Sequence, residues 1–239
     1  MRILLVGCEY VGTTTLAKAI FKWGSDEMGA DFGLFHDHWK IPDVTGHWPI
    51  DTDGFMNPDE QEGLLSVAPK VKEQMQRHSL YYHIQLGAFK KGHEEEQGFY
   101  SDYLAIGMHI EDSVYGPVYF GYGDDGQPGA RSIVEKTVEN SLLEFAPDFV
   151  LVLVEASPDV IRTRMKSDPH PRQVLRESDV EHVLARFREE YEQSVIPNRF
   201  TLDTTSVTTE QTLVSFTNKI EPFLSEDDHR RRQNHLIRH

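Results

Sequence analysis

The sequence predicts an α/β fold of three layers, with a central parallel sheet of about five strands, helices on both faces and a small lid. Two unbroken apolar runs, residues 3–6 and 149–154, are typical of strands buried on both faces. Segments with helical periodicity alternate with such runs, and this alternation indicates parallel pairing. No repeat or linker divides residues 1–224, so we expect a single domain there, followed by a charged and frayed tail at 225–239.

Composition narrows the classes of function. The chain has 239 residues, with 24 Lys and Arg against 39 Asp and Glu, and a formal net charge of −15. This excess of acid disfavours a nucleic-acid or membrane partner, because both present negative charge. The single cysteine, Cys8, excludes an internal disulfide framework, and no apolar stretch is long enough to span a membrane. We expect a soluble cytoplasmic protein, without a signal peptide, that binds a small molecule.

A glycine loop with the sequence GCEYVGTTT, residues 7–15, joins the first predicted strand to a predicted helix. Its Gly7-x4-Gly12 spacing fits the P-loop pattern G-x-x-x-x-G-K-[ST], in which glycines let the backbone approach a phosphate closely. The helix N-terminus adds unpaired N–H groups and the positive end of a dipole. Thr14 takes the position of the hydroxyl that contacts Mg²⁺, whereas Thr13 replaces the usual lysine. The residues expected to hold ATP are Gly7, Glu9, Tyr10, Val11, Gly12, Thr13, Thr14 and Thr15.

The remaining elements follow in alternation. In the first half we expect a strand at 32–35, a loop at 41–58, a helix begun by a capping box of Asn57 and Glu60, a long helix at 66–91 and a strand at 99–106. In the second half we expect a glycine-rich loop at 121–129, a helix at 131–145, the strand at 149–154, a helix at 157–165, the lid at 166–177, a helix begun by a capping box at 178–181, a strand at 200–202 and a helix at 213–223.

Polar residues gather at the end of the second predicted strand, where ligands bind in parallel sheets. Asp37 is the candidate for orienting the acceptor phosphate or hydroxyl. His36 and His38 share one face of an extended strand, so they either contact the substrate together with Trp39, or lie on the surface, or hold a zinc ion. No third protein ligand has a helpful spacing, which makes zinc the weakest of the three interpretations.

In their order, these motifs resemble the P-loop kinases of the nucleoside monophosphate kinase group, and thymidylate kinase most closely. The likeness rests on the glycine loop, on Arg77 in the long helix, on residues 109–119, and on residues 147–164 followed by a lid and residues 202–205. The resemblance implies transfer of the γ-phosphoryl group of ATP to a nucleotide with Mg²⁺, and a substrate contact for Arg77. Two features depart from it: Thr13, and Ile106-Gly107 where such kinases carry an Asp-Arg pair.

Phosphoryl transfer needs phosphates held in line, their charge neutralised, and a carboxylate to orient the attacking oxygen. The arginines expected to replace the charge of the missing lysine are Arg162, Arg164, Arg172 and Arg176, unless they only solvate a loop and a helix end. For the carboxylate, Asp102 and Glu111 stay open beside Asp37, and Asp112 is expected to complete the magnesium shell. Glu111 and Asp112 are equally consistent with acids placed at a helix start by the dipole. Tyr115 either stacks on a base or packs in the core.

Three functions therefore stay open. A nucleotide kinase comes first. A non-catalytic nucleotide-binding protein comes second, because Thr13 and the missing Asp-Arg pair weaken the catalytic pattern. An NTP hydrolase comes third, because the lid has no use in one. The sequence does not determine the oligomeric state, and a homodimer is one of the states compatible with it.

Overall fold

The computed structural model describes residues 1–32, 35–37, 46–48, 57–85, 102–170 and 173–238. Within them a six-stranded sheet has the order β3-β2-β4-β1-β5-β6. The strands are β1 (Arg2–Val6), β2 (Phe35–Asp37), β3 (Gly46–Trp48), β4 (Tyr103–Ile106), β5 (Val150–Glu155) and β6 (Asn198–Asp203). Every neighbouring pair is parallel except β2 with β3. The predicted parallel sheet is confirmed, with one antiparallel strand added at its edge.

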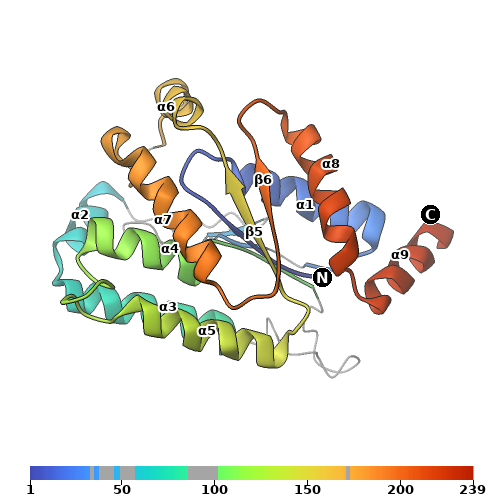
Figure 1. The fold of residues 1–239 in the computed structure, drawn as a ribbon, viewed down its shortest axis with the longest axis horizontal. Coiled ribbons are helices and arrows are strands. Elements are labelled where there is room, and N and C mark those ends of the chain that lie inside the picture. Colours follow the sequence, from blue (N-terminus) through green and yellow to red (C-terminus); the bar gives the residue numbers. More distant parts are fainter. Residues whose placement is uncertain (33–34, 38–45, 49–56, 86–101, 171–172, 239) are drawn as a thin grey trace.

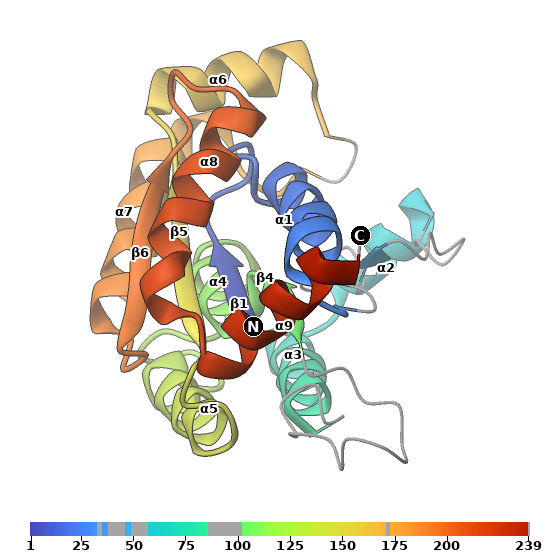
Figure 2. The same ribbon diagram turned by 90° about the vertical axis from the view of Figure 1, so that its right-hand side faces the viewer.

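Helices cover both faces of this sheet (Figures 1 and 2). They are α1 (Thr13–Met28), α2 (Pro58–Ser66), α3 (Pro69–Gln85), α4 (Met108–Tyr115), α5 (Arg131–Phe145), α6 (Pro158–Ser167), α7 (Val180–Gln193), α8 (Thr209–Ile220) and α9 (Glu226–Arg238). A π-helical turn, Gly116–Phe120, continues α4, and short 3₁₀ turns at Glu177–Asp179 and Glu221–Phe223 precede α7 and follow α8. Helices α1, α8 and α9 pack together on one face, whereas α3, α4, α5 and α7 pack together on the other.

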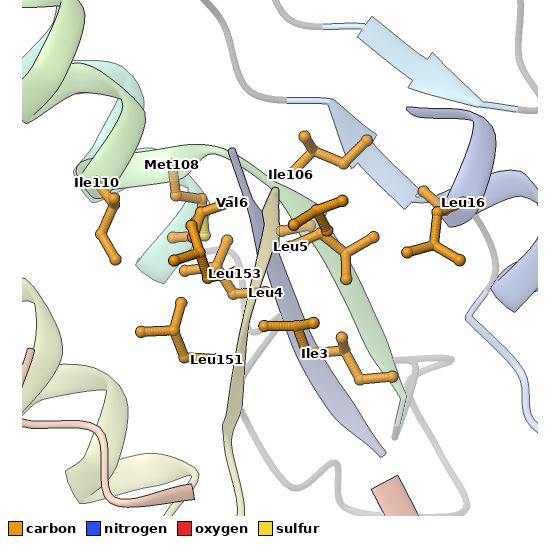
Figure 3. Packing of buried hydrophobic residues seen from close by; sticks show 14 of the residues in the cluster. Ile3, Leu4, Leu5, Val6, Leu16, Ile106, Met108, Ile110, Leu151 and Leu153 are labelled. Carbon is orange, nitrogen blue, oxygen red and sulfur yellow. The ribbon is translucent and has the colours of Figure 1, made fainter. Parts of the chain in front are cut away.

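Strand β1 lies at the centre of the core, because both faces of the sheet are covered there. Ile3, Leu4, Leu5 and Val6 have no exposed surface. In Figure 3, Ile3 and Leu5 point toward the side of Leu16 in α1, while Leu4 and Val6 point toward the side of Met108 and Ile110 in α4. An apolar residue is therefore required at every position of the strand, which explains the unbroken run.

Two local predictions are wrong. Residues 46–48, expected within a loop, form β3, which is too short to show a period of two in the sequence. The capping box expected at 178–181 is absent, because the Glu181 carboxylate binds Arg162 of α6 instead. Helix α7 begins only after Asp179, which makes no side-chain cap.

The tail is ordered, contrary to the prediction that it is frayed. Residues Glu226–Arg238 form α9, which packs on α1. Arg231 of α9 pairs with Asp102 at 2.9 Å, and Asp228 accepts a hydrogen bond from the Met1 amino group at 3.0 Å. The low apolar content of this segment predicted fraying, but buried ion pairs hold it against the amino ends of the strands.

Candidate functional site

The glycine loop, defined here as residues 7–12, joins β1 to α1 at the carboxyl end of the parallel strands. A Cβ atom on Gly7 would lie 2.4 Å from the carbonyl oxygen of Val154, so only glycine fits between the loop and β5. Gly12 has a φ of 96°, and a Cβ built on it meets nothing within 4 Å. The backbone is therefore left-handed at Gly12 and open on the side where a ligand would enter. This geometry fits the anion-binding loop expected from the spacing.

Three side chains hold this loop in place. The Tyr115 hydroxyl accepts the Glu9 N–H at 2.9 Å, and the Thr204 hydroxyl donates to the Val11 carbonyl at 2.8 Å. Arg164 donates to the Tyr10 carbonyl at 2.8 Å and to the Thr204 carbonyl at 2.8 Å. Burial lowers the pKa of Arg164 from its ordinary value, although an arginine stays charged at neutral pH. The loop is thus tied to α4, to α6 and to the residue after β6.

These contacts narrow the set of N–H groups that face a ligand. The Glu9 N–H is bonded to Tyr115, and the Val11 N–H to the Cys8 carbonyl at 3.2 Å. Helix α1 begins at Thr13, and the Leu16 N–H in its first turn donates to the Gly12 carbonyl at 2.9 Å. The N–H groups at a helix start point out of the helix N-terminus, toward the loop that precedes it. The Glu9 and Val11 N–H groups are therefore already engaged within the protein, and the start of α1 is the expected place for an anion.

The segment predicted as the lid, residues 166–177, contacts the glycine loop through its described residues. Glu9 accepts the Val174 N–H at 3.0 Å and the Leu175 N–H at 2.6 Å with one carboxylate oxygen. The Tyr10 hydroxyl accepts the His170 N–H at 2.8 Å and donates to Gln173 at 2.7 Å. Two side chains of the loop therefore bind residues 170–175 of the predicted lid.

Two residues predicted to supply a carboxylate belong to the same edge of the sheet as the loop. Asp37 ends β2 and is in register with Ile106 at the end of β4, although its side chain is not described. Glu111 is buried, and its Oε2 would lie 1.8 Å from a Cβ on Gly107, so its carboxylate packs on the residue that follows β4. The Gly107 N–H in turn donates to Leu5 of β1 at 2.8 Å. Glu111 and Asp37 both remain candidates for orienting an acceptor.

The structure contradicts the predicted role of Asp102 as the carboxylate that orients the attacking oxygen. It precedes β4, whose first residue, Tyr103, is in register with Arg2, so Asp102 lies at the amino end of the strands. There it is buried, pairs with the Met1 amino group and Arg231, and accepts the Asp31 N–H at 2.9 Å. The opposite edge of the sheet carries the glycine loop. A role for Asp102 in chemistry at the loop is therefore wrong.

The structure also contradicts the predicted role of Asp112 in a magnesium shell. Its carboxylate is fully buried, lies 2.6 Å from Nε of Arg131, and accepts a hydrogen bond from the Tyr122 hydroxyl at 2.6 Å. Burial raises the pKa of Asp112, and the opposing influence of Arg131 and Tyr122 does not reverse this rise. A carboxylate engaged by a buried arginine is unsuited to a magnesium shell. Asp112 instead helps to join α4 to the start of α5.

Arg77 belongs to the same buried network. It binds Glu73 one helical turn earlier, and Glu73 is also 3.2 Å from Arg131. Burial pushes the pKa of Glu73 upward, but hydrogen bonds from Arg77 and Arg131 outweigh it and leave this pKa lowered. The Arg77 side chain is 38% exposed, so it has the access that its predicted substrate contact requires.

The other predicted residues divide into three groups. Tyr115 is 1% exposed and packs edge-on against Phe187, so the base-stacking interpretation is wrong and the core interpretation holds. Arg162 lies on α6 and binds Glu181, while the Arg176 guanidinium lies 5.3 Å from the centre of the Tyr119 ring. His38, Trp39 and Arg172 lie outside the described residues, and His36 is described only by its backbone.

The described residues can be compared with the requirements of a metal site and of a membrane-spanning helix. There, no three His, Cys, Asp or Glu side chains are placed to hold a metal ion together. The zinc interpretation itself lies partly outside the described residues, because it needs His38. Thr14 lies in the first turn of α1, where a hydroxyl accompanies phosphates in the P-loop pattern. Among the described helices, none is both long and apolar enough to cross a membrane.

Two contacts of the glycine loop were not predicted from the sequence: the hydrogen bond from Thr204 and the binding of the lid by the Glu9 carboxylate. Thr204 follows β6 directly, at the edge of the sheet where parallel strands gather polar groups, so its position was a usable signal. Glu9 was expected to use its backbone, and nothing in the sequence shows that its carboxylate binds the lid.

No family model matches the chain, and no curated protein matches it. Solved structures do share its fold. The deoxyadenosine kinase of M. mycoides with bound dATP aligns with a TM-score of 0.54 and 16% identity, covering 92% of this chain and 100% of that chain. The YorR protein of Bacillus subtilis in complex with phosphorylated GDP aligns with a TM-score of 0.53 and 13% identity, covering 95% and 100%. The thymidylate kinase of Candida albicans aligns with a TM-score of 0.51 and 10% identity, covering 95% and 93%. At such identities the likeness shows that this chain shares its fold with these three proteins.

Proposed function

We propose that this protein is a P-loop kinase that transfers the γ-phosphoryl group of ATP to a nucleotide, thymidylate-like or of another small kind, with Mg²⁺. One observation carries the proposal: an open glycine loop whose own side chains hold a lid against it. Phosphoryl transfer needs positioned phosphates and exclusion of water more than covalent chemistry by the protein. A loop joined to a lid serves both needs, whereas a hydrolase must admit water.

The acceptor is inferred from the structural neighbours. One of them is the deoxyadenosine kinase of M. mycoides with the products dCMP and dCDP, with a TM-score of 0.50 and 16% identity. Another is a thymidylate kinase. Nucleosides and nucleotides are therefore the first acceptors to test. A buried single cysteine, Cys8, fits the reducing cytoplasm that we propose as the setting.

The described residues fit a nucleoside triphosphate. The open side of Gly12 and the first turn of α1 would hold its phosphates, and the Thr14 hydroxyl would contact the magnesium ion. When bound, Mg²⁺ neutralises charge on the phosphate oxygens. Asp37 or Glu111, at the same edge of the sheet, would orient the acceptor. Arg77, which is partly exposed, is our candidate for contact with the acceptor phosphate.

The absent lysine leaves a question of charge. Among the described arginines of residues 162–176, Arg164 contacts the glycine loop directly, because it donates to the Tyr10 carbonyl. Arg162 is engaged by Glu181, and Arg176 lies over Tyr119. We assign the replacement charge to Arg164, with Arg172 as the second candidate.

The charge assignment has its own test. Single Ala variants of Arg162, Arg164, Arg172 and Arg176 should reveal one that lowers kcat by ~10³ while KM changes little, the sign of a contact made in the transition state. Thr13→Lys should partly restore turnover in that variant. Normal turnover in all four variants would show that these arginines do not supply the charge.

Thr13 favours a second candidate, a nucleotide-binding protein without catalysis. Calorimetric titration with ATP, with and without Mg²⁺, followed by a product screen over nucleosides and nucleoside monophosphates, separates the two. Phosphorylated product that disappears in Gly12→Val supports the kinase. Tight ATP binding with no product from any acceptor supports the second candidate, and the absence of ATP binding overturns both.

A further inference from the structure

Glu9 is an acid at the second variable position of the glycine loop that we propose to bind phosphate. Glu9 precedes the lid-binding Tyr10 directly and lies three residues before Gly12 in the loop. The negative charge of such an acid repels phosphate through a partly buried medium, where screening is weak. The position of its carboxylate therefore needs another explanation.

The contacts of Glu9 supply that explanation. One oxygen of its carboxylate accepts two consecutive N–H groups of the lid, those of Val174 and Leu175, at 3.0 and 2.6 Å. Hydrogen bonds to an ionised acceptor are roughly twice as strong as those between neutral groups. The carboxylate thus satisfies two backbone donors where residues 174 and 175 contact the loop.

Glu9 is itself rigidly held. Its N–H donates to the hydroxyl of Tyr115, whose side chain is 1% exposed in the core. The carbonyls of the next two residues, Tyr10 and Val11, accept hydrogen bonds from Arg164 and Thr204. Because Glu9 is bonded to the buried Tyr115, a lid that binds the Glu9 carboxylate is fixed relative to both the loop and the core.

Tyr10 adds a second attachment on the same lid. Its hydroxyl accepts the His170 N–H at 2.8 Å and donates to Gln173 at 2.7 Å, and Gln173 donates to the Leu175 carbonyl at 2.7 Å. Tyr10 has a φ of 70°, a left-handed conformation that is rare outside glycine, and its side chain reaches the lid. Two adjacent residues of the loop therefore both serve to hold the lid.

We propose that Glu9 is a positioning residue that fixes the lid over the glycine loop, and that it does so at a cost in affinity for phosphate. The kinetic part of this inference rests on the proposed kinase function, whereas the attachment of the lid does not. The alternative is that burial of the Leu175 side chain, which is 1% exposed, holds the lid without Glu9.

Amide exchange in the ligand-free protein tests the attachment. In Glu9→Ala, the Val174 and Leu175 amides, followed individually by NMR, should lose protection by about 10- to 100-fold, the value of a hydrogen bond to a charged group. Glu9→Gln keeps an acceptor oxygen and should restore part of this protection. Glu177→Gln is the matched control, because Glu177 lies at the end of the same lid but pairs with Lys166 at 2.9 Å. Unchanged protection in Glu9→Ala would assign the lid to Leu175 and overturn the proposal.

Tyr10→Phe keeps the inference testable where Glu9→Ala does not fold. This variant removes only the hydroxyl, so the His170 amide should lose protection while the fold is kept. Protection at His170 equal to that of the wild type would contradict an attachment through the loop.

Kinetics test the consequence for turnover. Glu9→Ala should lower kcat at least about tenfold, while KM for ATP stays level or falls because a repelling charge is gone. Glu9→Gln should share the lower KM but recover part of kcat. A raised KM with normal kcat would assign Glu9 to phosphate binding instead and overturn the kinetic part. If no variant and no wild type turns over any acceptor, while exchange still rises in Glu9→Ala, the attachment stands and the kinase proposal fails.

Discussion

Replacing Arg131 by Met should destabilise the protein strongly, because Arg131 is the cation shared by two buried carboxylates. The side chains of Arg131, Asp112 and Glu73 are 3%, 0% and 0% exposed, and Arg131 lies 2.6 Å from Asp112 and 3.2 Å from Glu73. Met fills a similar volume but leaves Asp112 without its cation. Removing one partner of a buried ion pair costs about 3–5 kcal/mol. For a chain of this length that corresponds to a fall in Tm of about 10 °C.

Thermal and urea unfolding followed by circular dichroism at pH 7 measure this loss. The control is Arg188→Met, which removes a pair with Glu155 whose arginine is 61% exposed, and it should change stability by less than about 1 kcal/mol. The triple variant Arg131→Met, Asp112→Asn, Glu73→Gln should recover much of the loss, since no buried charge is left unpaired.

The pH dependence sharpens the test. Without Arg131, the pKa of Asp112 in the folded state rises further above its unfolded value. The variant then takes up a proton on folding, so its deficit should be small near pH 5 and should grow as the pH rises. An Arg131→Met loss no larger than that of Arg188→Met, or one that is the same at pH 5 and pH 8, would refute the reasoning.

Three further predictions concern the loop and a partly buried acid, Glu135. Gly12→Val should abolish ATP binding in calorimetry, because its side chain would enter the open side of the loop and its φ of 96° disfavours any side chain; undiminished affinity would contradict the loop assignment. Thr14→Ala should weaken ATP binding only when Mg²⁺ is present, and equal losses with and without Mg²⁺ would make Thr14 structural. Burial, together with the charge of Glu190, raises the pKa of Glu135 to about 9, so the stability from this protonated acid is full below its unfolded pKa and is lost as the pH rises toward 9. Glu135→Gln should flatten that loss, which amounts to at most about 1.4 kcal/mol per pH unit, and an unchanged slope in urea unfolding between pH 6 and 9 would contradict it.

Elements whose signals are local were predictable. The Asn57 capping box is present with both of its hydrogen bonds, because a cap depends only on residues three apart. The helix expected at 131–145 has those bounds, since its periodicity and its flanking loop are contained in one window. The glycine loop was predicted with its strand and helix for the same reason.

Features that depend on distant partners were not predictable. Asp102 lies next to a strand of the core, and only the fold shows that it faces Arg231 and the Met1 amino group instead of the glycine loop. Glu181 has the spacing of a capping box, but its carboxylate binds Arg162 on another helix instead of the backbone of its own helix. In the same way, the Asp112 carboxylate pairs with Arg131, a residue far along the chain, instead of facing a metal ion.

The candidate site divides along the same line. Gly7 and Gly12 are required by backbone geometry, which leaves a trace in the spacing of the sequence. The side-chain role of Glu9 leaves none, because a glutamate looks the same whether it points to solvent or to the backbone of a segment that lies far ahead in the chain.

The central place of β1 has a consequence for how the protein folds during synthesis. Its partners are made much later, since Leu5 pairs with Ile106 of β4 and Val6 with Leu153 of β5. At about 5–20 residues per second, an apolar strand leaves the ribosome at least several seconds before its first neighbour exists. During that interval it is an unpaired, aggregation-prone segment. We expect the nascent chain to depend on a chaperone that shields this strand, and the isolated protein to refold slowly because its central contacts are so distant in sequence.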